Sequence, residues 1–76
     1  MAGKKCIICD CNYNIMKQLA KKLQFLWCAD GYIRDAEKAK DRECAAAFRR
    51  IKADEERHAK MLKALLLKKA KAGKLD

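Results

Sequence analysis

The sequence predicts an all-α protein: an antiparallel hairpin of two helices that dimerises into a four-helix bundle. Two stretches carry apolar residues at alternating steps of three and four, which is the spacing of one face of an α-helix. The chain has no Pro and three Gly, and it is rich in helix-forming Ala, Lys, Leu, Glu and Arg. With 76 residues it is too short to build a large core alone, so we expect a partner.

The first helix is expected over about residues 13–39, after a cysteine-containing arm at residues 1–12 that shows no helical pattern. Asn12 or Asn14 can cap this helix, because a side-chain oxygen accepts a hydrogen bond from the first turn. Gly31 weakens the helix without ending it. The apolar stripe consists of Met16, Leu19, Leu23, Leu26 and Ile33.

A turn at residues 40–42 is expected to join this helix to a second one over about residues 43–71. Asp41 is placed to cap the second helix, and Gly73 is a plausible end signal. Lysines near residue 70 suit the negative C-terminal pole of a helix. The stripe of this helix reads Cys44, Phe48, Ile51, Glu55, His58, Leu62 and Leu65.

Dimerisation is predicted because each helix of a lone hairpin can bury only one side. Phe25, Trp27 and Leu66 lie off the centre of the two stripes, where they would stay in contact with water in a monomer. Two hairpins packed as a symmetric four-helix bundle would cover them.

The charge of +9 is concentrated at the two ends of the chain. Residues 1–24 carry +4 and residues 60–76 carry +5, whereas residues 25–59 are neutral. A hairpin brings the two basic ends together, where they could meet nucleic acid, an acidic protein or anionic lipid, or form a solvated tail. No nucleic-acid-binding motif is visible, so a nucleic-acid partner has no motif to support it.

The five cysteines are an odd number with no signal peptide ahead of them, which argues against a secreted disulfide framework. We therefore expect a cytoplasmic protein with free or metal-bound thiols. No apolar stretch approaches the roughly 20 residues that span a bilayer, so we expect no membrane partner.

Glu55 and His58 form the clearest candidate site, because a three-residue step places both side chains on one face of a helix. Both occupy positions of the stripe where apolar residues are expected, and polar groups facing a core need a partner or a metal. Helical bundles that bind two metal ions use this Glu-x-x-His spacing. The alternative is a position at the rim of the seam, where both groups bond to neighbouring side chains.

The stretch from Tyr32 to Leu62 resembles the hairpin of the rubrerythrin branch of the ferritin-like superfamily. The matching residues are Tyr32 and the segments 35–41, 48–51 and 54–62. The resemblance implies a ferritin-like four-helix bundle in which Glu55 and His58 are metal ligands from the second helix. A symmetric dimer would present two Glu and two His, enough for one ion such as iron or zinc.

One departure from this family concerns the first helix. The family has a Glu a turn or two before the Tyr, whereas residues 23–28 of this chain contain no carboxylate. Asp30 is the nearest substitute, but in a hairpin that turns near residue 41 it faces about residue 51 or 52, roughly one turn (~5.4 Å) from the level of Glu55. The departure argues against catalysis by a di-iron site and leaves metal binding open.

Cys6, Cys9 and Cys11 form a second candidate site, because thiolates at this spacing can wrap one soft metal ion. Cys28 or a second chain could supply a fourth ligand. The alternatives are a flexible arm or a redox-active pair of thiols. Cys28 and Cys44 are otherwise expected to be small core residues on the helices.

Two functions follow from these observations. The first is a metal-binding or degenerate, non-catalytic ferritin-like protein that dimerises. The second is a helical dimerisation or adaptor module whose basic end binds an acidic partner or nucleic acid.

Overall fold

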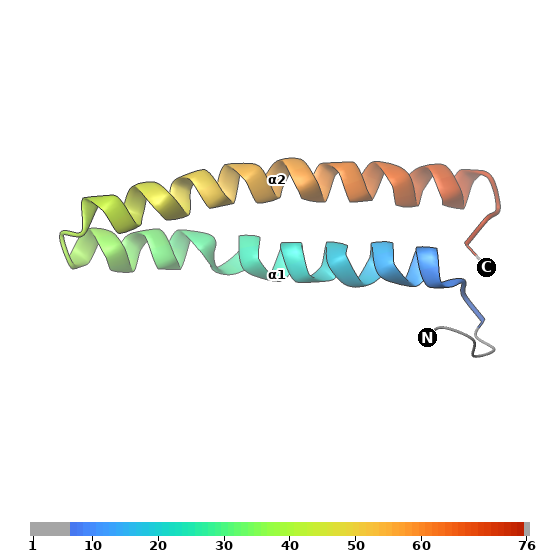
Figure 1. The fold of residues 1–76 in the computed structure, drawn as a ribbon, viewed down its shortest axis with the longest axis horizontal. Helices are drawn as coiled ribbons and strands as arrows, with labels where there is room; N and C mark the ends of the chain where they lie inside the picture. The colour runs from blue at the N-terminus through green and yellow to red at the C-terminus, as the bar shows by residue number, and fades with distance from the viewer. Residues whose placement is uncertain (1–6, 76) are drawn as a thin grey trace.

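The computed structural model describes residues 7–75 and shows two long helices packed side by side. Helix α1 spans Asp10–Lys38 and helix α2 spans Arg42–Lys71, with a tight turn between them. The helices run antiparallel, so that the start of α1 and the end of α2 lie at one end of the rod (Figure 1). The predicted helical hairpin is therefore confirmed. The molecule is a flat rod with extents of 50 × 24 × 14 Å.

Helix α1 begins at Asp10, about three residues earlier than predicted. The predicted Asn caps were wrong, because Cys9 is the N-cap and its Sγ accepts a hydrogen bond from the backbone N–H of Asn12 at 3.4 Å. Asn12 lies within the first turn of α1, where its side chain is buried and has a different role. Its Nδ2 donates to the carbonyl oxygen of Lys74 at 2.8 Å, which ties the end of the chain to the start of α1.

The start of α2 is as predicted. Asp41 is the N-cap, and its Oδ1 accepts a hydrogen bond from the backbone N–H of Cys44 at 3.0 Å. The end of α2 also agrees, because Gly73 follows the last turn with a φ of 69°. The turn lacks the usual Gly, and Lys40 adopts the left-handed conformation there with a φ of 57°.

The seam between the helices is built from alanines and not from the two predicted stripes. Ala29 and Ala36 of α1 and Ala45 and Ala59 of α2 are buried. They recur at multiples of seven residues, so they stay on one side of each helix. Small side chains allow two helix backbones to approach closely. The larger apolar residues therefore lie beside the seam.

The two predicted stripes lie on opposite broad faces of the hairpin. Leu19, Leu23 and Leu26 of α1 line a groove with Ala59 and Lys63 of α2, and we call this side the leucine face. On the other side the ring of Tyr32 lies 6.0 Å from that of Phe25 and 5.4 Å from that of Phe48, and we call it the aromatic face. Cys44 lines a hollow on the aromatic face.

The helical geometry explains this arrangement. Phe25 and Leu26 are 100° apart around α1, so a seam centred on Ala29 passes between them. The stripe of α2 that contains Phe48 falls on the aromatic side of its alanines. Sequence periodicity predicted both stripes but could not tell that they point to different sides.

In the part of the chain that the structure describes, neither helix is both long and apolar enough to cross a membrane.

Candidate functional site

Glu55 and His58 lie one turn apart on α2 at the edge of the seam. His58 Nδ1 is 2.7 Å from Glu55 Oε1 and donates to it in the tautomer that carries the proton on Nδ1. The other carboxylate oxygen, Oε2, accepts a hydrogen bond at 3.4 Å from Nζ of Lys22, which comes from α1. The Glu55 side chain is 22% exposed and that of His58 is 43% exposed. In a single hairpin this arrangement matches the rim position that the sequence offered as an alternative.

The electrostatics at Glu55 favour the carboxylate form. The hydrogen bond from His58 is the main cause that lowers the pKa of Glu55, and the positive charge of Lys22 acts in the same direction. Partial burial opposes them without reversing the shift. Glu55 is therefore held as an anion between an imidazole and an ammonium group.

Asp30 lies apart from this pair, in an ion pair of its own. Its Oδ1 accepts a hydrogen bond from Lys52 Nζ at 2.8 Å, as expected for a residue that faces position 51 or 52. That hydrogen bond and the Lys52 charge lower the pKa of Asp30. Among residues 7–75, no three His, Cys, Asp or Glu side chains are grouped so that they could hold a metal ion. A structural zinc site takes about four ligands, so Glu55 and His58 of one chain do not complete one.

The cysteine site is only partly within the structure, because Cys6 lies outside the described residues. Cys9 and Cys11 are exposed free thiols at the start of α1. Cys9 caps the helix, and Lys69 Nζ of α2 donates to Cys11 Sγ at 3.7 Å. Metal binding by Cys6, Cys9 and Cys11 stays a prediction.

Cys28 and Cys44 are half-buried thiols on the helices and not core residues as expected, because alanines occupy the seam. A hydrogen bond with Cys28 raises the pKa of the Tyr32 hydroxyl on the aromatic face. This contact links the thiol to the Phe25, Tyr32 and Phe48 rings.

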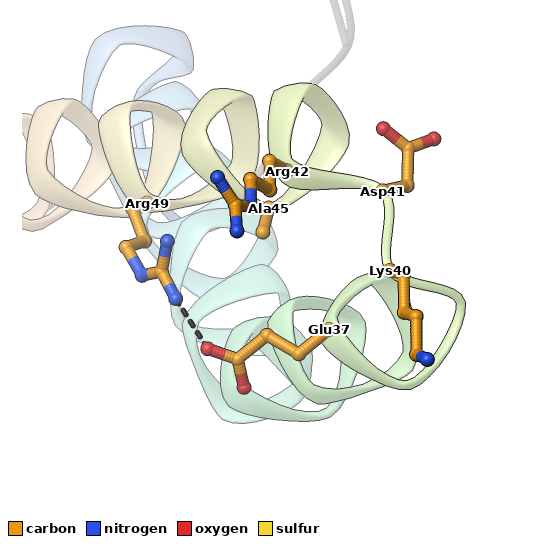
Figure 2. A pocket seen from close by; sticks show the side chains of 6 residues that line it. All are labelled: Glu37, Lys40, Asp41, Arg42, Ala45 and Arg49. Carbon is orange, nitrogen blue, oxygen red and sulfur yellow. Dashed lines mark hydrogen bonds and ion pairs between the residues drawn. The ribbon is translucent and has the colours of Figure 1, made fainter.

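A hollow at the turn is lined by charged residues of both helices (Figure 2). Arg49 reaches from α2 across to Glu37 on α1 and forms an ion pair with its carboxylate. Both side chains are about half exposed, so this ion pair adds little to stability. This ion pair leaves no net charge from Arg49 and Glu37 on the leucine face near the turn. The ion pair between Lys52 and Asp30 does the same further along this face.

Several large apolar side chains are exposed on the outer surfaces of both helices. Trp27 is 90% exposed and Leu23 is 53% exposed on α1. Ile51, Met61, Leu65 and Leu67 are exposed along α2. Where such side chains lie together in one patch, they are a common sign of an interaction site.

Comparisons with protein-family models, curated proteins and solved structures find no significant match to this chain. The resemblance of residues 32–62 to a rubrerythrin-type hairpin therefore stays a prediction.

Proposed function

We propose that the chain is a helical association module that acts as a homodimer, with two hairpins packed through their aromatic faces into a four-helix bundle. The hairpin buries little of its own apolar surface: among residues 7–75, the buried residues are Ile15, Asn12 and the four seam alanines. Domains of this size usually need a partner, a metal or a disulfide to be stable. The observation that carries the proposal is a row on α2 that contains the exposed side chains of Ile51 and Leu65. This row lies on the aromatic face.

That row suits pairing with a second copy of itself. Ile51, His58 and Leu65 recur every seven residues, with His58 near the middle of α2. An antiparallel pairing of α2 with its copy, about a two-fold axis near His58, would set Ile51 opposite the partner's Leu65. A symmetric interface of this kind uses the same patch on both subunits.

The charge distribution favours the antiparallel arrangement. Residues 7–24 and 60–75, which form the open half of the rod, carry nine Lys against Asp10, a net charge of +8. Residues 25–59, which form the turn half, carry equal numbers of positive and negative groups. Antiparallel hairpins place each basic half beside a neutral half, whereas parallel hairpins would place two basic halves together.

Metal binding is the second candidate, and it depends on this dimer. Glu55 and His58 lie within the row that would form the interface, and their oxygen and nitrogen atoms already converge at 2.7 Å. Two copies would bring two carboxylates and two imidazoles to one axis, which is enough for a single ion such as zinc or iron. Without metal the same pairs would form a polar centre in the interface, as expected of a degenerate, non-catalytic relative.

Sedimentation equilibrium of the full chain at micromolar concentration tests the dimer. We expect a dimer for the natural sequence and a monomer for the Ile51→Glu/Leu65→Glu variant, because charges would replace the apolar contacts. The matched control is Leu67→Glu, an exposed apolar residue on the leucine side of α2. It should stay dimeric.

Helicity measured by circular dichroism separates loss of association from loss of folding. A folded monomer of the natural sequence at these concentrations would contradict the proposal. The metal candidate is tested in the same samples. Zinc should raise the melting temperature of the natural dimer but not of His58→Leu, and an equal response in both would exclude His58 as a ligand.

A further inference from the structure

We infer that the leucine face binds the surface of an anionic membrane, with α1 lying along the headgroup layer. The inference is independent of the proposed dimer, because the aromatic face lies on the opposite side of the hairpin. It concerns surface binding, for which no spanning helix is needed. It therefore replaces the expectation of no membrane partner, which rested only on the lack of a long apolar stretch.

The apolar part of the surface is a continuous row on α1. Leu19, Leu23 and Leu26 line the groove of the leucine face. Trp27 follows Leu23 by four residues and lies next to it on the outer side of the helix. Leu23 is 53% exposed on the leucine face, and Trp27 is 90% exposed at the outer edge of that face.

The charge beside this row is positive: Lys60, Lys63 and Glu56 line the groove from α2, a net charge of +1. Neither Lys60 nor Lys63 forms an ion pair with another described residue. Nearer the turn, Lys52 is neutralised by Asp30, and Arg49 by Glu37. The unpaired lysines and the exposed leucines therefore share the open half of the rod, whose described residues carry +8.

The shape of the molecule fits a planar partner. The rod is only 14 Å thick, and its two helices lie side by side in the plane seen in Figure 1. The leucine face is one of its two broad sides. It can lie flat on a surface along the length of α1.

Both features of this surface match anionic lipid. Apolar side chains that include Trp and Leu, flanked by Lys, are typical of helices that lie in the membrane interface. A lipid surface offers negative headgroups to the lysines and acyl chains to Trp27 and the leucines. Nucleic acid would attract the lysines but would leave the exposed leucines in water, so the observations favour lipid.

Trp27 makes a direct test possible because it is the sole tryptophan of the chain. The full chain is mixed with vesicles of phosphatidylcholine alone, or with added phosphatidylglycerol. We expect sedimentation with the anionic vesicles only, together with a shift of Trp27 emission to shorter wavelength as the indole enters the interface. High salt should weaken binding.

Paired variants separate the two parts of the surface. Lys60→Gln/Lys63→Gln should bind anionic vesicles about thirtyfold more weakly, from the usual contribution of a lysine at an anionic surface. The matched control, Lys38→Gln/Lys40→Gln near the turn, removes the same charge and should bind normally. Leu23→Gln should lose both binding and the emission shift, whereas Met61→Gln, an exposed residue of α2, should keep them.

Three results would overturn the inference. The first is equal binding to neutral and anionic vesicles, and the second is equal loss of binding in a variant and its control. The third is binding to a duplex oligonucleotide as tight as to anionic vesicles, with Trp27 emission unchanged by either. That result would show that charge alone selects the partner. Repeating the vesicle assay with Ile51→Glu/Leu65→Glu keeps the inference separate from the dimer, because a monomer should still bind.

Discussion

Lys40 and Gly73 occupy the same position at the ends of α1 and α2, the left-handed residue of a Schellman motif. The backbone N–H of Lys40 donates to the carbonyl of Glu37, and that of Asp41 donates to the carbonyl of Ala36, both at 3.0 Å. Gly73 donates to Ala70 and Lys74 donates to Lys69 in the same pattern. The φ angles are 57° and 69°, in the region that glycine adopts without steric cost.

Replacing Lys40 by Gly should therefore stabilise the hairpin by about 0.5–1 kcal/mol, because it removes the strain of a side chain in the left-handed region. The reciprocal change, Gly73→Ala, should destabilise it by about 1 kcal/mol. Urea unfolding followed by circular dichroism measures both effects. If Lys40→Gly lowers the stability, the greater freedom of Gly in the unfolded chain outweighs the strain.

The alanine seam leads to a second prediction. Ala29 is fully buried between the helices, so a larger side chain there must push them apart. Ala29→Leu should cost about 1–3 kcal/mol of stability. Ala20→Leu, at an exposed position of the same helix, should change stability by no more than about 0.5 kcal/mol. Equal stability of the two variants would show that the seam has room for a leucine.

The sequence predicted the helices well because their signals are local. The three- and four-residue spacing, the Asp41 cap and the Gly73 end are each contained within a few residues, and the structure has them where they were expected. The predicted start of α1 was wrong because Asn12 was expected to cap the helix, whereas Cys9 caps it. Its amide group instead reaches Lys74, which is 62 residues away along the chain. A contact of that range leaves no local pattern.

The candidate site was harder to predict because it depends on how each helix is rotated. The stripe of the second helix correctly placed Glu55 and His58 side by side. Their exposure, however, depends on the seam, which is centred on Ala59, the residue after His58. The large residues dominate a hydrophobic pattern, whereas here the small ones are buried. One signal could have located the seam. Ala29 and Ala36 are seven residues apart, and Ala45 and Ala59 are twice that distance apart along the chain.

The contacts of Glu55 with Lys22 and His58 lead to a prediction about pH. Its pKa in the folded chain is lowered from an ordinary value of 4.5, so the folded state holds this proton less tightly than the unfolded state. The stabilisation is therefore present above about pH 4.5 and is lost as the pH falls through the lower, folded pKa. We expect the free energy of unfolding of the natural chain to fall on acidification through this range. Asp30, whose pKa is also lowered, should add to the loss at slightly lower pH.

Glu55→Gln isolates the contribution of this carboxylate. The variant should be less stable than the natural chain at neutral pH, and its stability should decline less on acidification, because glutamine has no proton to gain. Glu56→Gln is the matched control, since Glu56 lines the leucine face on the other side of the seam. Its decline should follow that of the natural chain. Urea unfolding at one fixed protein concentration prevents dilution from shifting the dimer equilibrium within the series. Identical pH profiles for the two variants would mean that the contacts of Glu55 with His58 and Lys22 do not stabilise the fold, because Glu56 is an exposed carboxylate without these contacts.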